Sequence, residues 1–297
     1  MAWLRKISLN IYVSGKLYKT YTADGTRKTL AISFNVSKNS VGEPNESTVV
    51  LTNVSPDTRA TLLACTNKDR ATVELFAGYE DDGLTLLASG DLIKMWPEKQ
   101  DTENTFTLTF LDGFQAVQNS HLEQQFNPGT PIKDIVLSLA GSFANNGVAV
   151  DSTKVHIVGA IGSRGYTVSG RTATTLDLLA ASYGFTWSIQ DGVFQAYMDE
   201  NKSKKASQKV YSVSYRKQNL LKATPELGEK YMQQIGMKIE AILNPKCKCM
   251  DLIDLESLVY PQYDGKYEIH NVQFTGDTNG TDWKMEIDSK TIVSKEE

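Results

Sequence analysis

A strand–turn–strand pattern occurs twice in the chain, once in each half. In both copies the returning strand alternates large apolar residues with polar ones, which is the period-two pattern of a strand with one buried face. The apolar residues are Phe106, Leu108 and Phe110 in the first copy and Trp283, Met285 and Ile287 in the second. Any two amphipathic hairpins can look alike, so chance is one interpretation. The other, which we adopt as a hypothesis, is that the chain contains two related β-barrels.

The first β region covers residues 1–118. Apolar and polar residues also alternate in four other runs, at 7–13, 32–36, 49–51 and 73–77. One helix is expected among these strands, because Ser55 is a suitable N-cap and Pro56 suits the first helical position. We expect Leu62 and Leu63 of this helix to face the barrel, and the helix to end near Asn67.

Residues 119–209 differ in character and predict a small α/β domain with a linker. A helix is expected after Thr130-Pro131, because apolar residues recur there at helical spacing, and Gly147 suits its end. Another helix is expected through 176–180, stopping at Gly184.

A hairpin should follow these helices. Asp191-Gly192 lies between two alternating runs, and this dipeptide favours a tight turn because both central residues need positive φ. The polar segment 199–209, which contains a short run of lysines, is interpreted as a linker or long loop. Beyond it the chain is β again, with strands expected at 210–216, 233–243, 256–260, 266–275 and 282–291. The predicted fold is therefore mainly β with an α/β insertion, divided at 1–118, 119–209 and 210–297.

Composition narrows the class of protein. The chain has 297 residues, a net charge of −4 and no large basic block, which argues against a general nucleic-acid binder. No apolar run has the length of a membrane span, and the first residues lack the features of a signal peptide. We therefore expect no membrane insertion and no Sec export. The three cysteines, Cys65, Cys247 and Cys249, fit a reducing cytoplasm without disulfides.

We expect no metal site. His121, His156 and His270 are far apart in sequence, and none has the spacing of metal ligands. Cys247 and Cys249 would point to the same side if they lay in a strand. A structural zinc site needs two more ligands, and no second cysteine pair exists.

We also expect no catalytic and no cofactor-binding residues. The glycines at 159, 162 and 165 match neither a dinucleotide-binding motif nor a phosphate-binding loop, so a loop is the preferred interpretation. No nucleophile-elbow motif occurs. Carboxylates gather near turns or strand ends, at Asp81-Asp82 and at Asp251, Asp254 and Glu256. Nothing in the sequence places any two of them across a glycosidic bond.

Aromatic residues leave one binding role open. Trp96, Trp187, Trp283 and Tyr260 could line a sugar-binding face. Each tryptophan occupies an apolar position of a strand pattern, so core packing is the preferred interpretation.

An ordered set of short motifs runs along most of the chain. They are 51–59 (LTNVSPDTR), 73–79 (VELFAGY), 89–92 (SGDL), 111–113 (LDG), 169–170 (SG), 183–192 (YGFTWSIQDG), 243–245 (LNP), 265–269 (GKYEI), 275–278 (TGDT) and Trp283. With these motifs the chain resembles the tail (baseplate) hub proteins of tailed bacteriophages, the late-control-protein hub family, which is related to the hub part of type VI secretion spikes. It departs from the family at 246–250 (KCKCM), where a glycine-containing turn is expected. Its compact length also leaves little room for another inserted domain or a fused lysozyme.

The resemblance implies a function in assembly. A hub of this family is a homotrimer in which each subunit contributes two tube-like barrels, so that a ring of six barrels adapts the six-fold tail tube to the three-fold spike. The implied partners are the tail tube protein, the tail spike protein and other baseplate proteins, without recognition of a nucleic-acid sequence. The implied location is the virion, with assembly in the host cytoplasm. Strand edges left open in one chain would pair with neighbouring chains.

Two other classes remain as alternatives to this structural, non-enzymatic hub. One is a tail-associated enzyme that degrades peptidoglycan, which requires a placed carboxylate pair or a metal site. The other is a carbohydrate-binding β-module, which requires an exposed aromatic platform.

Overall fold

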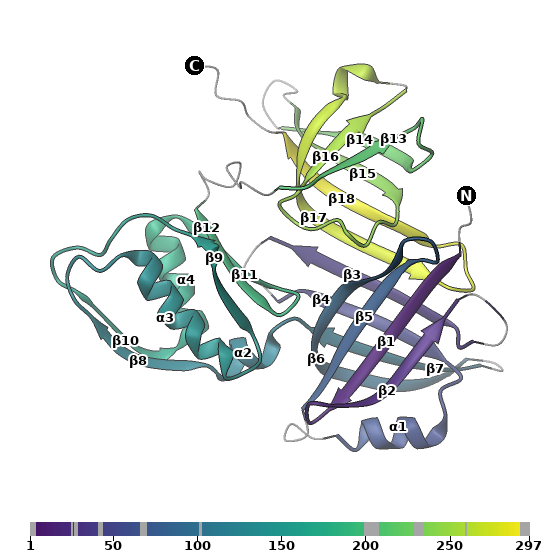
Figure 1. Ribbon diagram of the computed structural model, residues 1–297, viewed down its shortest axis with the longest axis horizontal. Helices are drawn as coiled ribbons and strands as arrows, with labels where there is room; N and C mark the ends of the chain where they lie inside the picture. The colour runs from purple at the N-terminus through teal and green to yellow at the C-terminus, as the bar shows by residue number, and fades with distance from the viewer. Residues whose placement is uncertain are drawn as a thin grey trace. The chain divides into compact units, whose positions relative to one another are not determined.

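The computed structural model shows a mainly β protein, with 58% strand and 16% helix. It describes residues 4–24, 26, 29–40, 44–65, 70–100, 103–198, 208–228, 234–258 and 260–291. The chain divides into two compact units (Figure 1). Unit 1 contains residues 1–39, 46–110 and 206–297, and unit 2 contains residues 40–45 and 111–205.

Unit 1 is built on a single sheet of 13 strands. Its N-terminal half consists of β1 (Arg5–Val13), β2 (Lys16–Ala23), β3 (Ile32–Asn39), β4 (Glu46–Thr52), α1 (Pro56–Leu63), β5 (Ala71–Tyr79), β6 (Gly83–Gln100) and β7 (Glu103–Leu111). Its C-terminal half consists of β13 (Val210–Ser214), β14 (Leu220–Leu227), β15 (Gln234–Ile242), β16 (Leu252–Glu256), a 3-10 turn (Pro261–Tyr263), β17 (Gly265–Asp277) and β18 (Trp283–Thr291). The main strand order is β14-β15-β18-β17-β3-β4-β7-β6-β5-β1-β2, and β16 joins β13 to β17.

The apolar positions of the alternating runs form the core of unit 1. In β1, β3 and β5 the alternate residues are buried, as the sequence pattern predicts; they are Ile7, Leu9, Ile11, Ile32, Phe34, Val36, Val73, Leu75 and Ala77. The same cluster includes Phe106, Leu108 and Phe110 of β7 and Trp283, Met285 and Ile287 of β18. The two predicted hairpins, β6–β7 and β17–β18, are therefore present, and their apolar faces pack into one continuous core.

Helix α1 begins where the sequence places it but ends earlier. Ser55 is the N-cap, and its Oγ accepts a hydrogen bond from the Thr58 backbone N–H at 3.4 Å. The helix ends at Leu63, and Asn67 lies outside the described residues. Leu62 is 0% exposed, but Leu63 is 48% exposed. The expectation that both leucines face the core is wrong, because adjacent helical residues point about 100° apart.

The C-terminal strands also include one correction. The runs expected at 210–216, 233–243, 266–275 and 282–291 correspond to β13, β15, β17 and β18. The strand expected at 256–260 is wrong: the structure has β16 at Leu252–Glu256, and Pro261 then opens a 3-10 turn. Ile253 and Leu255 supply the buried face of β16, and a proline beyond it cannot donate to a ladder. The edge strand β14 was not predicted.

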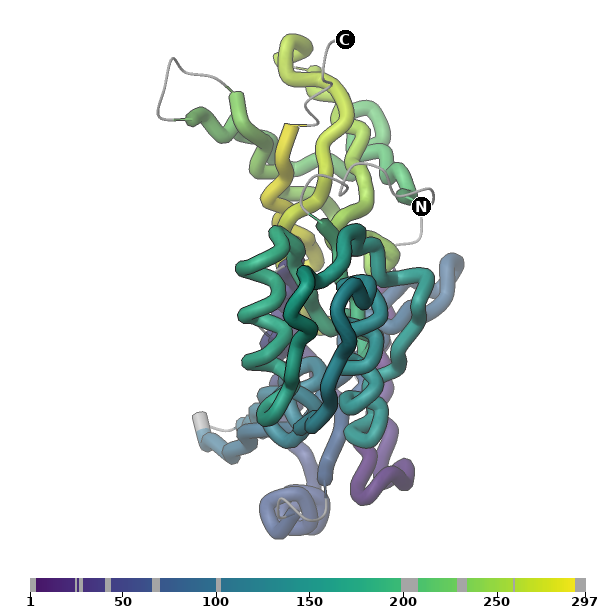
Figure 2. The backbone as a smooth tube through the Cα atoms, turned by 90° about the vertical axis from the view of Figure 1, so that its left-hand side faces the viewer, coloured from purple at the N-terminus to yellow at the C-terminus, as the bar shows by residue number. Residues whose placement is uncertain are grey.

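Unit 2 is a small α/β body. It consists of α2 (Phe114–Asn119), β8 (His121–Phe126), α3 (Ile132–Ala144), β9 (Ala149–His156), β10 (Tyr166–Arg171), α4 (Thr172–Tyr183), β11 (Phe185–Gln190) and β12 (Val193–Met198). Strands β8 and β10 form one sheet, and β11, β12 and β9 form another. The two predicted helices are α3 and α4, which lie beside each other (Figure 2). Their apolar faces pack on Trp187 and Phe194, whose rings are 6.0 Å apart.

The predicted hairpin of unit 2 is held from outside its own strands. Asp191 and Gly192 have φ angles of 53° and 75°, as the predicted turn requires. Both of their backbone N–H groups donate to the carboxylate of buried Asp112, which follows β7. The Asp-Gly turn and the LDG motif at 111–113 are therefore two parts of one local structure.

Candidate functional site

The main feature of unit 1 is a seam at which its two halves share one sheet. Strand β3 of the N-terminal half pairs antiparallel with β17 of the C-terminal half, from Asn39 opposite Asn271 to Ser33 opposite Asp277 (Figure 1). Buried Thr278 extends the pairing, because its backbone N–H donates to the Ile32 carbonyl at 3.1 Å. The two halves are therefore joined by a backbone ladder rather than by side chains alone.

One face of the sheet near the seam is polar. In neighbouring strands, Glu240 lies opposite Glu286, Glu286 opposite Gln273, and Gln273 opposite Ser37. Lys284 offsets the repulsion between the two adjacent glutamates, because its Nζ is 2.8 Å from a carboxylate oxygen of each. The hydrogen bonds that Lys284 donates, first to Glu240 and then to Glu286, raise its pKa. This row of charged and amide groups gives the sheet a hydrated surface over both halves.

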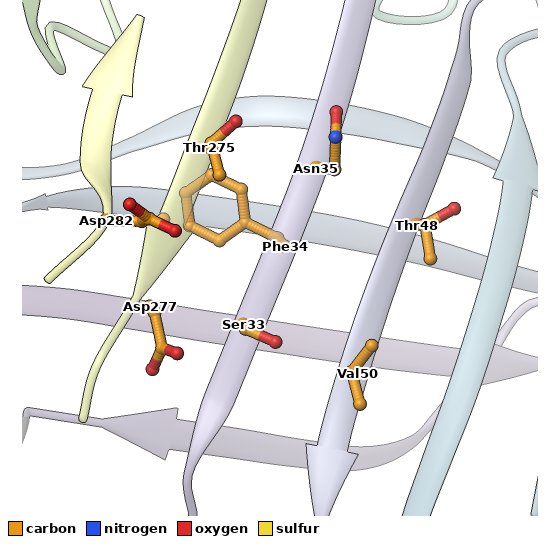
Figure 3. A pocket seen from close by; sticks show the side chains of 9 residues that line it. Ser33, Phe34, Asn35, Thr48, Val50, Thr275, Asp277 and Asp282 are labelled. Atoms are coloured by element: carbon orange, nitrogen blue, oxygen red, sulfur yellow. The ribbon is translucent and has the colours of Figure 1, made fainter. Parts of the chain in front are cut away.

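A shallow hollow of about 260 Å³ opens at the seam (Figure 3). It is lined by Ser33, Phe34, Asn35, Thr48, Val50, Thr275, Gly276, Asp277 and Asp282. The lining offers hydroxyl, amide and carboxylate groups and includes no histidine, lysine or cysteine. Asp277 and Asp282 belong to the two ends of one turn, where the Asp277 N–H donates to the Asp282 carbonyl at 2.8 Å. The hollow therefore presents polar groups suited to contact with another surface.

The sheet has three edge strands in the described part of the chain: β2 and β14 at the ends of the main strand order, and β13, which pairs only with β16. Strand β2 pairs only with β1, and β14 pairs only with β15, in the part of the chain that the structure describes. The two strands at the ends of the main order expose apolar side chains: Leu17 and Tyr18 on β2, and Leu221 and Leu227 on β14. Unpaired backbone groups next to exposed apolar side chains form a template for another strand.

The structure does not gather the histidines. His121 and His156 lie in unit 2, where the His121 Nδ1 is 3.0 Å from the Asn119 carbonyl and the His156 ring stacks on Tyr197 at 5.4 Å. His270 lies in β17 of unit 1. Within the described residues, no three side chains of His, Cys, Asp or Glu are placed to hold a metal ion.

Cys247 and Cys249 lie in turns between β15 and β16 and not in a strand. Burial is the main cause that raises the pKa of the Cys247 thiol, and Cys249 Sγ donates to the Lys38 carbonyl at 3.4 Å. In this segment Met250 has a φ of 71°, so a methionine takes the left-handed position at the place where the family resemblance leads one to expect glycine. The three cysteines form no disulfide.

The glycines at 159, 162 and 165 lie in a loop, as predicted. The loop is bonded to the start of α3: the Ile132 N–H donates to the Gly159 carbonyl at 3.0 Å, and the Ile161 N–H donates to the Thr130 carbonyl at 3.0 Å. Its backbone groups therefore serve local packing within unit 2.

Four of the five predicted carboxylates lie at turns or strand ends, and Asp254 lies in the middle of a strand. Asp82 forms an ion pair with Lys246 at 3.3 Å, and Glu256 forms one with Arg216 at 3.3 Å. Asp81 belongs to the turn between β5 and β6, Asp251 precedes β16, and Asp254 lies within β16.

Two of the three tryptophans weighed as platform residues are core residues. Trp187 and Trp283 are buried, and the Trp187 Nε1 donates to Asp177 Oδ1 at 2.9 Å. Trp96 is 42% exposed, so the expectation of core packing is wrong there. It lies on β6 beyond Asp91, the last residue paired with β5, where less of the sheet covers the strand. Tyr260 is exposed as well.

Helices long and apolar enough to cross a bilayer are absent from the described part of the chain.

A family model described as baseplate hub gp41 matches residues 13–287. No curated protein matches the sequence. Among solved structures, the tail protein from Neisseria meningitidis MC58 has a TM-score of 0.64 at 10% identity, over 96% of each chain. The 43 kDa tail protein of prophage MuSo2 from Shewanella oneidensis has a TM-score of 0.62 at 12% identity, also over 96% of each chain.

A third structure comes from a secretion machine. The E. coli c3393 protein, described as a component of the type VI secretion system, has a TM-score of 0.57 at 8% identity, over 95% of this chain and 77% of that one. At such identities these likenesses show a shared fold.

Proposed function

The chain belongs to the baseplate hub gp41 family, and from that membership we propose that it is the structural hub of a phage tail baseplate. In this role three copies form a ring that adapts the six-fold tail tube to the three-fold spike. The observation that carries the proposal is the sheet of unit 1, which joins two halves at the seam and is open at β2 and β14. Three chains with two such halves each supply six similar elements around one axis.

The open edges support ring closure by a head-to-tail contact. A ring of identical chains needs two different surfaces that fit each other, because a heterologous contact repeats around the axis until it closes. Strands β2 and β14 lie at opposite ends of the strand order and expose apolar side chains. Pairing of β2 in one chain with β14 in the next would cover both edges.

The domain division proposed with this role has tube-like barrels at 1–118 and 210–297, with an α/β domain and linker at 119–209. The paired hairpins support it: β6–β7 and β17–β18 each lie inside their half, and each returning strand has a second neighbour in the same half, β4 for β7 and β15 for β18. The proposed partners are the tail tube protein, the tail spike protein and other baseplate proteins in the virion. The proposed role is not catalytic, which agrees with the structural description of the family.

The ring is tested by measuring the mass of the assembly and by introducing opposite charges on the two edge strands β2 and β14. Sedimentation equilibrium of the purified chain should give three times its mass of 32.9 kDa. Leu17→Glu on β2 and Leu221→Lys on β14 should each weaken the trimer. The double variant should recover it in part, because the two new charges are opposite and meet across the same contact. Leu178→Glu, at an exposed leucine of α4, is the matched control. A wild-type chain that remains monomeric, alone and with the spike protein, would refute the proposal.

A further inference from the structure

A second connection between the halves of unit 1 is a side-chain contact at one end of the seam. Arg5, the first residue of β1, donates from its guanidinium to three carbonyls of the turn between β17 and β18. The distances are 3.1 Å to Asp277, 3.0 Å to Gly280 and 3.3 Å to Thr281. The same guanidinium lies 5.4 Å from the ring centroid of Trp283, the first residue of β18. One side chain from the N-terminal half therefore binds both the turn and the aromatic anchor of the C-terminal half.

Aromatic packing surrounds this contact. Trp283 meets Phe34 of β3 edge-on at 5.9 Å and Tyr79 of β5 edge-on at 6.1 Å. The Tyr79 hydroxyl also donates to the Leu243 carbonyl at 2.8 Å, next to β15. Gly276 is required beneath these rings, since a Cβ there would lie 2.4 Å from the Phe34 ring. Phe34, Tyr79 and Arg5 all come from the N-terminal half and converge on a single residue of the C-terminal half.

The position of Arg5 in the strand order shows that its contact constrains the shape of the N-terminal half. Strand β1 is separated from the seam by β4, β7, β6 and β5 in the sheet, yet its first residue contacts the turn that follows β17. The N-terminal half must curl for this contact to form. An antiparallel ladder alone lets the two halves twist about its line. A side chain from β1, a strand distant from the seam in the sheet, is attached at the end of the ladder and opposes that twist.

The chemistry of the contact favours arginine. Several N–H donors in one rigid plane can reach three carbonyls at once while the flat face stacks on an indole ring. A lysine at this position would keep the charge and the contact with the ring, but its ammonium could not span the three carbonyls.

We propose that Arg5 is a positioning residue that fixes the angle between the two halves of unit 1 and thereby allows the ring of subunits to close. This inference rests on the proposed hub function. The angle decides whether β2 of one chain meets β14 of the next, because those edges belong to different halves. Loss of Arg5 therefore acts at a distance from both edges.

The test compares Arg5→Ala and Arg5→Lys with Lys6→Ala in the full chain. Lys6 is the neighbour of Arg5 on β1, and its exposed ion pair with Glu80 at 3.3 Å makes it the matched control. Arg5→Ala should weaken self-association by about tenfold or more in sedimentation. Amide exchange should become faster at 33–37 and 272–277 along the seam and stay unchanged between β5 and β6. Arg5→Lys should fall between Arg5→Ala and the wild type, and Lys6→Ala should match the wild type.

Each alternative result is decisive. Wild-type association in Arg5→Ala would overturn the inference and leave the ring intact. Weaker association with unchanged exchange along the seam would also overturn it, because Arg5 would then act at the interface itself. A wild-type chain that never associates would instead refute the hub proposal, whatever the exchange at the seam shows.

Discussion

The returning strands of the two halves carry the same alternation but differ in what covers their second face. In β7 the apolar residues Phe106, Leu108 and Phe110 are fully buried, and Thr107 and Thr109 on the opposite face are only 7% and 4% exposed. In β18 the apolar residues are buried as well, but the opposite face carries charged residues, of which Glu286 is exposed. A shared pattern therefore supports two different environments.

The difference shows that the C-terminal half keeps one face of its returning strand exposed. Residues 106–110 of β7 are buried on both faces of the strand. Strand β18 buries one face and contributes the other to the polar surface that crosses the seam, where Lys284 bridges Glu240 and Glu286. The C-terminal half therefore keeps a polar and partly exposed face along its returning strand.

The largest effect is expected from truncating the buried aromatic residues. Phe106→Ala and Trp283→Ala should each cost about 3–5 kcal/mol in free energy of unfolding, since each leaves a cavity in a close-packed core. Denaturant titration measures the loss. Amide exchange should show that Phe106→Ala loosens the N-terminal half alone, whereas Trp283→Ala loosens both, because Phe34 and Tyr79 pack on Trp283. Leu178→Ala, at an exposed position, should change stability by less than about 0.5 kcal/mol. Equal effects of both core variants across the two halves would contradict the distinction.

A reciprocal exchange tests the two second faces directly. Thr109→Glu should cost about 2–4 kcal/mol, because it places a carboxylate on the covered face of β7. Glu286→Thr should change the free energy of unfolding by no more than about 0.5 kcal/mol, because that position faces water. Thermal unfolding of the two variants side by side is sufficient. If Thr109→Glu is tolerated as well as Glu286→Thr, the face of β7 is not enclosed.

The seam itself is sensitive to a single methyl group. Gly276→Ala should destabilise the protein by about 1–3 kcal/mol, because the added Cβ is forced against Phe34 and the Trp283 ring. Gly141→Ala in α3, where a Cβ meets nothing within 4 Å, is the control and should be neutral or stabilising. A neutral result at Gly276 would mean that the aromatic packing at the seam adjusts freely.

The smallest effect concerns the charges of the polar face. Lys284→Met should cost about 0.5–1 kcal/mol, with Lys284→Arg as the charge-preserving control. The folded-state pKa of Lys284 is raised above its unfolded value, so its contribution is fully present below the unfolded pKa and is lost only as pH rises through the folded one. The difference between wild type and Lys284→Met should therefore be the same at pH 7 and pH 9. A difference that disappears between these values would show that another group titrates.

The sequence predicts strands well where one face is buried and the other is wet. Alternation identifies β1, β3, β5, β7, β17 and β18, because their apolar residues all enter the core. It misses β2 and β14, since edge strands are exposed on both faces and lose the period-two signal. Pro225 within β14 further weakens that signal, although proline is tolerated in an edge strand.

The contacts between the two halves of unit 1 are harder to predict from the sequence. Cap and turn signals placed α1, α3, α4 and the hairpin at Asp191-Gly192, since these depend on neighbours in the chain. The pairing of β3 with β17, and the contact of Arg5 with Trp283, depend on segments from opposite ends of the chain. No local pattern specifies such partners. The exposure of Trp96 could not be predicted either, because it depends on how far β5 extends alongside β6.

The seam also sets an order of events during synthesis. Gln273 of β17 bonds to Asn35 of β3 across 238 residues of sequence, so β3 must wait for almost the entire chain before it meets its partner. Contacts of such separation form slowly, because a long loop has to close first. Until β17 is translated, one edge of β3 remains unpaired. This edge can pair with an incorrect strand, such as one from a second nascent chain. Strand β17, which covers this edge, is translated long after β3, so the C-terminal half protects the N-terminal half within one chain.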